Sequence, residues 1–209
     1  MRKPALLILA LGILTASYTQ DNSVKNKYKK KPSLGFHFTL HDFTTAAAIK
    51  STSISKVLDN NQWHNLNTMS SGLAGSYLKG LNDYIDFNAR LGIASVTYPI
   101  PNKTNNETAM LLESDANLNF KLFTDKYWVS PFASVGLGAS KWKGYYGAYL
   151  PVGLGATVNL SENGYLIFTS AYRVAVTTAT TSNHFFYSFG VGFSLGGSDK
   201  DATPASSPN

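Results

Sequence analysis

The sequence of 209 residues contains no cysteine, which excludes disulfide scaffolds, cysteine-ligated zinc and anchoring through a lipid-modified N-terminal cysteine. Charged residues make up only 14% of the chain, against about 25% in ordinary soluble proteins. Beyond the N-terminus, no apolar run reaches the roughly 18 residues of a transmembrane helix, which excludes a helical membrane bundle. What the chain does have is 17 glycines, 13% aromatic and 44% hydrophobic residues. This balance favours an all-β protein, including one whose surface faces lipid.

The net charge of +6 is concentrated near the N-terminus. Five lysines crowd the short segment Lys25–Lys31, whereas residues 32–196 carry 10 basic and 9 acidic side chains and are nearly neutral. A nucleic-acid-binding face needs basic residues spread over a folded surface. We therefore expect no nucleic-acid partner.

Both ends of the chain are predicted to lie outside the folded domain. Residues 1–19 have the charged start, short apolar core and small residues of a secretory signal peptide, although a buried N-terminal helix or strand is the alternative. Residues 20–33 are predicted to form a solvated, Lys-rich periplasmic arm, either a linker or a segment that contacts the cell wall or anionic lipid through Lys25–Lys31. Residues 197–209 have the composition of a flexible C-terminal tail.

Residues 34–196 divide into eight segments in which apolar and polar residues alternate. The pattern is clearest in residues 112–122, where Leu118 and Phe120 belong to the apolar set and Asn117 and Asn119 to the polar set. Several segments reach the about nine to eleven residues that a tilted strand needs to cross a bilayer. The segments span 34–41, 69–79, 84–98, 112–122, 129–139, 148–159, 166–174 and 185–195.

The connections alternate between short and long. Short turns at 80–83, 124–126 and 161–164 alternate with longer loops at 44–68, 99–109, 141–145 and 177–183. This alternation is typical of an outer-membrane barrel, with short turns on the periplasmic side. The sequence therefore predicts an all-β fold, an eight-stranded antiparallel up-and-down transmembrane β-barrel with both termini in the periplasm. Loop 44–68, with a short helix expected within 46–58, is where we would look for an extracellular ligand.

The apolar faces carry no Lys or Glu, so we expect them to point toward outer-membrane lipid and lipopolysaccharide. An eight-stranded barrel has an interior only just filled by side chains, which predicts a plugged lumen. Charges enclosed there have to pair, and Asp86 is expected to lie directly opposite Lys121. A path for protons or ions is the alternative role. The predicted lumen network comprises Asp86, Arg90, Glu113, Asp115, Lys121 and Arg173.

Aromatic residues near the strand ends suggest the interfacial girdles of a membrane barrel. Tyr84, Trp128 and Tyr165 are expected at the periplasmic rim. The outer rim is expected to carry Tyr98, Trp142 and Tyr146. The alternative is that these are ordinary core aromatics.

Several strings support a resemblance to a known family, among them Gly35–Phe38, Asp115–Lys121, Val129–Phe132 and Tyr172-Arg173. Over residues 34–195 the sequence resembles the OmpA-type eight-stranded outer-membrane barrels, in the form found in Bacteroidota. The resemblance implies a bacterial outer-membrane protein of structural or surface-interaction type. Many such proteins carry a peptidoglycan-binding domain after a linker, and this chain is expected to be a barrel-only or truncated form.

The chain contains four histidines, the residues most often used in catalysis and metal binding. His37 and His41 lie about 13 Å apart on one strand face, at roughly 3.3 Å per residue, which is too far for one metal ion. No catalytic set, phosphate loop or dinucleotide motif is readable, so we expect no enzyme activity, cofactor or metal. Two alternatives stay open: a lipid-modifying barrel enzyme that uses His184 and Ser188, and a secreted soluble β-barrel that binds a small apolar ligand.

Overall fold

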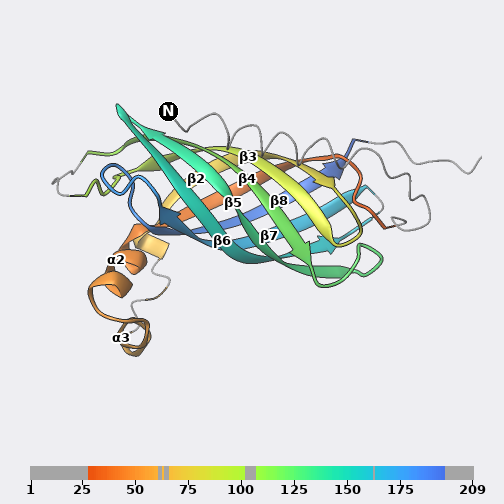
Figure 1. The fold of residues 1–209 in the computed structure, drawn as a ribbon, viewed down its shortest axis with the longest axis horizontal. Coiled ribbons are helices and arrows are strands. Elements are labelled where there is room, and N and C mark those ends of the chain that lie inside the picture. The colour runs from red at the N-terminus through yellow and green to blue at the C-terminus, as the bar shows by residue number, and fades with distance from the viewer. Residues whose placement is uncertain (1–27, 61–62, 64–65, 102–106, 162, 196–209) are drawn as a thin grey trace, which may run out of the picture.

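The computed structural model describes residues 28–60, 63, 66–101, 107–161 and 163–195. Eight antiparallel strands form a closed barrel in which each strand pairs with its sequence neighbours and the last pairs with the first (Figure 1). The predicted all-β, eight-stranded up-and-down barrel is thereby confirmed. The strands are β1 (Ser33–Asp42), β2 (Ser70–Gly80), β3 (Ile85–Val96), β4 (Ala109–Lys121), β5 (Val129–Trp142), β6 (Tyr145–Asn159), β7 (Gly164–Ala175) and β8 (His184–Ser194).

Side chains alternate between the lumen and the outer surface, because successive residues of a strand point to opposite faces of the sheet. In β4 every second residue from Leu111 to Lys121 is buried, and the residues between them are exposed. Leu118, Val152 and Phe189, on three different strands, are 38%, 53% and 46% exposed. The apolar faces therefore point outward, as the sequence predicted.

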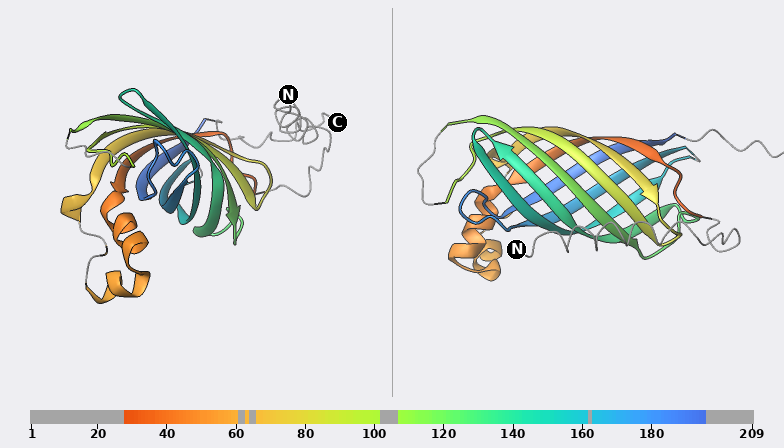
Figure 2. Two further views of the ribbon diagram at one scale, coloured as in Figure 1. Left: turned by 60° about the vertical axis from the view of Figure 1, so that its left-hand side comes forward. Right: turned by 45° about the horizontal axis from the view of Figure 1, so that its top comes forward.

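The two ends of the barrel differ. The connections at 81–84, 122–128 and 160–163 are short and lie at the same end as residues 28–32, and we call this the turn end. The opposite, loop end carries α2 (Phe43–Ser51), α3 (Ile54–Asp59) and the 3-10 turn η2 (Leu66–Thr68). Figure 2 shows the tilted strands and the two helices beside one end of the barrel.

Two helices stand where the sequence predicted one, because Thr52 and Ser53 interrupt the helical stretch. Asp42 caps α2 by accepting a hydrogen bond from the Thr45 amide at 2.8 Å, and Ser53 caps α3 by accepting one from the Lys56 amide at 3.3 Å. No helix in the described part of the chain is long and apolar enough to cross a membrane.

Glycines on the lumen face make room for large rings on the neighbouring strand. Gly138 is paired with Tyr149, and a Cβ atom at Gly138 would lie 2.2 Å from the tyrosine ring. Gly155 is likewise paired with Phe132, and a Cβ atom at Gly155 would lie 2.3 Å from the phenylalanine ring. The small cross-section of an eight-stranded barrel is therefore filled by pairing a ring with a glycine.

Candidate functional site

The middle of the lumen holds four charged side chains from three strands, which we call the central ion cluster: Arg90 on β3, Glu113 and Asp115 on β4, and Arg173 on β7. Arg90 donates to both carboxylate oxygens of Asp115, with Nη2–Oδ1 at 3.1 Å and Nε–Oδ2 at 3.3 Å. Arg173 donates from Nη2 to Asp115 Oδ2 at 2.8 Å and from Nη1 to Glu113 Oε2. The structure thus brings these four predicted residues together as two balanced pairs of opposite charge.

Aromatic and polar side chains surround this cluster. Both guanidinium groups lie over the ring of Phe186, with Cζ at 4.3 Å for Arg90 and 3.7 Å for Arg173. Arg90 also donates to Ser188 Oγ at 3.3 Å. Stacking and hydrogen bonding therefore hold both arginines in one conformation, which suits groups that cannot be hydrated at this depth.

Two histidines meet beside Glu113, because ring closure places β1 next to β8. His41 Nδ1 lies 3.5 Å from Glu113 Oε2, and His184 Nε2 lies 3.8 Å from Glu113 Oε1. The sequence pattern related His41 only to His37 on its own strand and His184 only to Ser188, so the meeting of the two histidines was not predicted. His37 itself forms a lumen hydrogen bond with Ser76 Oγ at 2.7 Å.

His41, Glu113 and His184 are a set that could ligate a metal ion, since their ligand atoms lie within 4.8 Å of one another. Two histidines and a carboxylate suit transition metals. However, the Arg173 guanidinium donates to Glu113 and lies 3.5 Å from His184 Nε2. A cationic side chain already neutralises the carboxylate, so a divalent ion would add unbalanced charge to a buried site.

A second group of charges lies nearer the turn end, and we call it the turn-end ion cluster: Lys30, Asp86, Lys121 and Asp125. Lys121 Nζ lies 3.0 Å from Asp86 Oδ1 and 2.9 Å from Asp125 Oδ2. The prediction that Asp86 stands directly opposite Lys121 was wrong, because the register pairs Asp86 with Asn119. The long lysine side chain nevertheless reaches back along the same face to Asp86.

Lys30 was expected to be solvated with the rest of the N-terminal arm, and that expectation was wrong. Its side chain is buried, with Nζ 3.5 Å from Asp125 Oδ2 and 4.3 Å from the centre of the Tyr165 ring. Its carbonyl accepts a hydrogen bond from the Gly80 amide, which fixes the backbone against β2. Burial lowers the pKa of the Lys30 ammonium group, while Asp125 and Asp86 act in the opposite direction. Residues 20–27 of the arm lie outside the described part.

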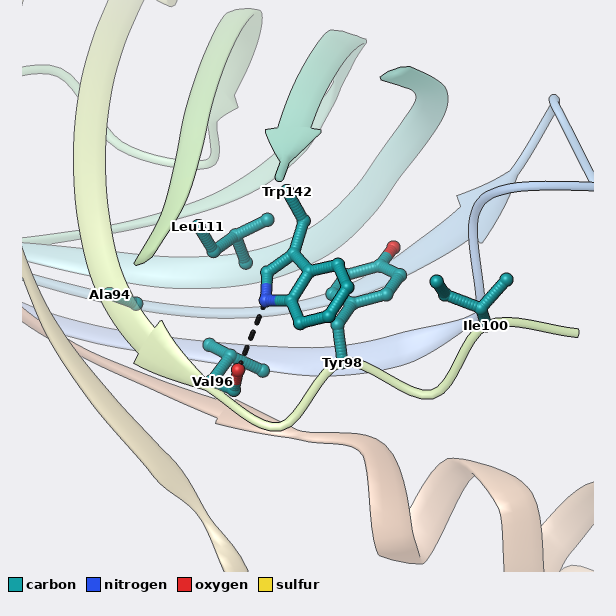
Figure 3. Close-up of a cluster of buried hydrophobic side chains, with 6 residues drawn as sticks. All are labelled: Ala94, Val96, Tyr98, Ile100, Leu111 and Trp142. Carbon is teal, nitrogen blue, oxygen red and sulfur yellow. Dashed lines mark hydrogen bonds between the residues drawn. The ribbon is translucent and has the colours of Figure 1, made fainter. Parts of the chain in front are cut away.

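Near the loop end the lumen is filled by an apolar cluster (Figure 3). Trp142 donates from Nε1 to the Val96 carbonyl at 3.1 Å, and the Tyr98 ring stacks on it at a centroid distance of 6.1 Å. Both aromatic residues were predicted in the outer-rim girdle, and both are buried: Tyr98 is 1% exposed and Trp142 is 3% exposed. The cluster consists of Ala94, Val96, Tyr98, Ile100, Leu111 and Trp142.

Tyr165 was also predicted in a girdle and is buried in the lumen, packed with Phe132 and Ile167. The strand alternation could have indicated this, since Tyr98, Trp142 and Tyr165 each fall on the polar face of the predicted pattern. Tyr84, Trp128 and Tyr146 are 55%, 71% and 65% exposed, and each lies next to or within one residue of a strand end.

A small cavity lies beside the central ion cluster. One cavity of about 10 Å³ lies against His41, Arg90, Glu113, Asp115 and Arg173, which is about the volume that one water needs. A small apolar ligand would not fit in this cavity. His184 and Ser188, the residues of the enzyme alternative, are buried at 1% and 6% exposure and face the lumen.

No protein-family model and no curated protein matches the chain. Among solved structures, Neisserial surface protein A is similar, with 13% identity, coverage of 80% of this chain and 99% of that one, and a TM-score of 0.53. The N-terminal β-barrel domain of Pseudomonas aeruginosa OprF is 14% identical over 79% of this chain and 98% of its own, with a TM-score of 0.45. Ail of Yersinia pestis is 12% identical, with coverage of 79% and 97% and a TM-score of 0.42. The chain thus has the fold of the OmpA-type eight-stranded outer-membrane barrels.

Proposed function

We propose that this chain is an integral outer-membrane barrel of structural or surface-interaction type, with a closed lumen and no catalytic role. The observation that carries the proposal is the distribution of charge on the barrel wall. Within the described strands, the outward face carries a charged residue only at Lys79 and Lys141, each the second-last residue of its strand. Charged residues on a lipid face cost about 2–4 kcal/mol at the bilayer midplane and about 0–1 kcal/mol near the interfaces.

The outer wall is also shaped for lipid chains. Two shallow apolar furrows of about 550 and 500 Å³ run over it, the first lined by Phe38, Leu73, Ile93 and Met110 and the second by Phe38, Leu154, Phe168 and Phe189 among others. A closed barrel leaves no unpaired strand edge, which hydrocarbon requires. Tyr84 and Trp128 at the turn end and Tyr146 at the loop end then serve as interfacial aromatics, and we infer that lipid or lipopolysaccharide surrounds the wall between them.

Three layers support a closed lumen. The loop-end cluster around Trp142, the central ion cluster and the turn-end ion cluster follow one another along the barrel. The charges in each ion cluster are balanced by charges of the other sign, so neither offers an uncompensated site for a passing ion. We infer that the network formed by Asp86, Arg90, Glu113, Asp115, Lys121 and Arg173 is structural.

The orientation follows from the asymmetry of the ends. The loop end has the connections 43–69, 97–108 and 176–183 beside the tight turn at 143–144, whereas all three connections at the turn end are short. Longer connections at one end are typical of barrels whose short turns face the periplasm. Because β1 begins and β8 ends at the turn end, we infer that both termini lie in the periplasm. The loop formed by residues 43–69 then lies on the cell surface, where an extracellular ligand would bind. We infer that residues 1–19 are the signal peptide that directs export.

Membrane fractionation of the expressing bacterium tests this proposal. We expect the protein in the outer-membrane fraction, with faster migration in unheated than in boiled gel samples. Protease added to intact cells should cut within 43–69. Recovery in the soluble fraction would contradict membrane insertion, and cutting only after permeabilisation would reverse the orientation. Alanine at His184 and Ser188 should leave the lipid A mass spectrum unchanged, and a loss of a modified species would support the enzyme alternative.

A further inference from the structure

The helical hairpin at the loop end projects sideways from the barrel. Figures 1 and 2 show α2 and α3 beside the end of the barrel, with α3 the farther from the wall. Phe43, the first residue of α2, fixes the start of the hairpin by packing on His184 and Tyr98 at centroid distances of 4.4 and 5.1 Å. The hairpin therefore leaves the mouth of the barrel across its axis, in the direction of a surrounding membrane plane.

Trp63, which follows the hairpin in the chain, packs on the outer wall of the barrel. The Trp63 ring lies 5.1 Å from the ring of Phe185, between centroids. Phe185 in turn neighbours Tyr172 on β7 at 4.9 Å and Tyr187 on β8 at 6.3 Å. These outward-facing aromatics near the loop end have the composition of an interfacial girdle. The contact of Trp63 with Phe185 therefore lies near the loop-end rim of the wall, where aromatic residues of a membrane barrel mark the boundary between hydrocarbon and head groups.

One exposed edge of α3 is apolar. Ile54 and Leu58 lie four residues apart, on one face of the helix, and are 56% and 54% exposed. At about 100° per residue, Lys56 and Asp59 lie on the opposite side, and both are exposed. Val57 is buried. A short helix with one apolar edge and one charged edge is suited to an interface between lipid and water.

We propose that α3 lies in the outer-leaflet interface, with Ile54 and Leu58 among the lipids and Lys56 and Asp59 toward water. The occupant of this apolar edge is a lipid surface, because Trp63, five residues after Leu58, packs on Phe185 of the apolar wall that lipid would surround. The proposal rests on the membrane insertion proposed above. It gives loop 43–69 a second role, as an anchor that holds the loop end at a fixed depth.

The cysteine-free sequence allows a direct test. Single-cysteine variants I54C and L58C, with K56C and D59C as matched controls on the same helix, are labelled with an environment-sensitive fluorophore. The full barrel is reconstituted into phosphatidylcholine vesicles with brominated acyl chains. Labels at 54 and 58 should emit at shorter wavelength and be quenched roughly twofold more than labels at 56 and 59, because an interfacial helix buries its apolar face about 5–10 Å deep. Equal, water-like emission at all four positions would overturn the proposal.

A fifth variant separates this inference from membrane insertion itself. Leu137 is 69% exposed on the outward face of β5, far from the hairpin in the chain. Quenching at L137C without quenching at L58C would show that the barrel is inserted but that α3 does not lie in the interface, and would overturn the proposal. Absence of quenching at both positions would contradict insertion as well. Shielded emission at L58C that bromolipid does not quench would indicate contact with protein and would also overturn the proposal.

Discussion

Arg173 on β7 and Asp115 on β4 meet across the lumen, with Nη2 2.8 Å from Oδ2, although their strands are not neighbours in the sheet. The contact joins opposite walls of the barrel. Neither side chain is more than 6% exposed. The free energy of such a pair depends on keeping both partners, because loss of one leaves a buried charge uncompensated.

The first prediction concerns this contact. Arg173→Met should lower the free energy of unfolding by about 3–5 kcal/mol, because it leaves Glu113 and Asp115 without their shared partner. Denaturant unfolding in detergent micelles, followed by tryptophan fluorescence, measures the change. Glu107→Gln is the control, since its contact with Lys143 is exposed and its loss should leave the midpoint unchanged. Equal effects of the two substitutions would contradict a buried network.

Packing of rings against lumen glycines gives the second prediction. Gly138→Ala should destabilise the barrel by about 1–3 kcal/mol, because the new methyl group would overlap the Tyr149 ring. Gly75→Ala adds the same methyl group at a position with no atom within 4 Å and should be neutral. The same unfolding assay compares them. A neutral Gly138→Ala variant would mean that the tyrosine ring is free to move away.

Lys30 gives a prediction about pH. Burial lowers the pKa of Lys30 in the folded protein, so the unfolded chain, with a value near 10.5, binds the proton more tightly. Stability relative to Lys30→Met should therefore rise as pH increases from below the folded pKa toward 10.5. Unfolding of both proteins across this range gives the difference. A flat difference would indicate that Lys30 is solvated, and a falling one that Asp125 and Asp86 outweigh burial; either result would contradict the prediction.

The strand pattern was sufficient to predict the barrel and the residues of the central ion cluster. Alternation assigns each residue to a face, and distance from a turn gives its height, so Arg90 and Asp115 could be matched without coordinates. Both steps use information within one strand or one hairpin. The encounter of His41 with His184 depends on closure between β1 and β8, which no local pattern contains.

The remaining errors have a different physical origin. Tyr98 and Trp142 were assigned to the girdle by their position near strand ends, although the alternation placed them inward. Near the end of a narrow barrel, a large ring can cap the lumen as well as mark the interface. Lys30 was assigned to solvent by the composition of its segment, which does not reveal that Asp125 offers it a buried partner.

Conductance tests the closed lumen. In planar bilayers the purified barrel should show no stable open state of porin size, because rings and paired charges fill its cross-section. Trp142→Ala alone should not open it, since both ion clusters remain. Steady channels in the unmodified protein would contradict the proposed structural role of the network.

Spin-label accessibility tests most directly which face of the barrel meets lipid. Nitroxides are attached at Leu118→Cys, Val152→Cys and Phe189→Cys, and their collisions with oxygen and with a water-soluble nickel complex are compared in vesicles. The accessibility to oxygen should be high and the accessibility to nickel low at all three positions, because these outward side chains lie among acyl chains. High nickel accessibility at all three would contradict this prediction.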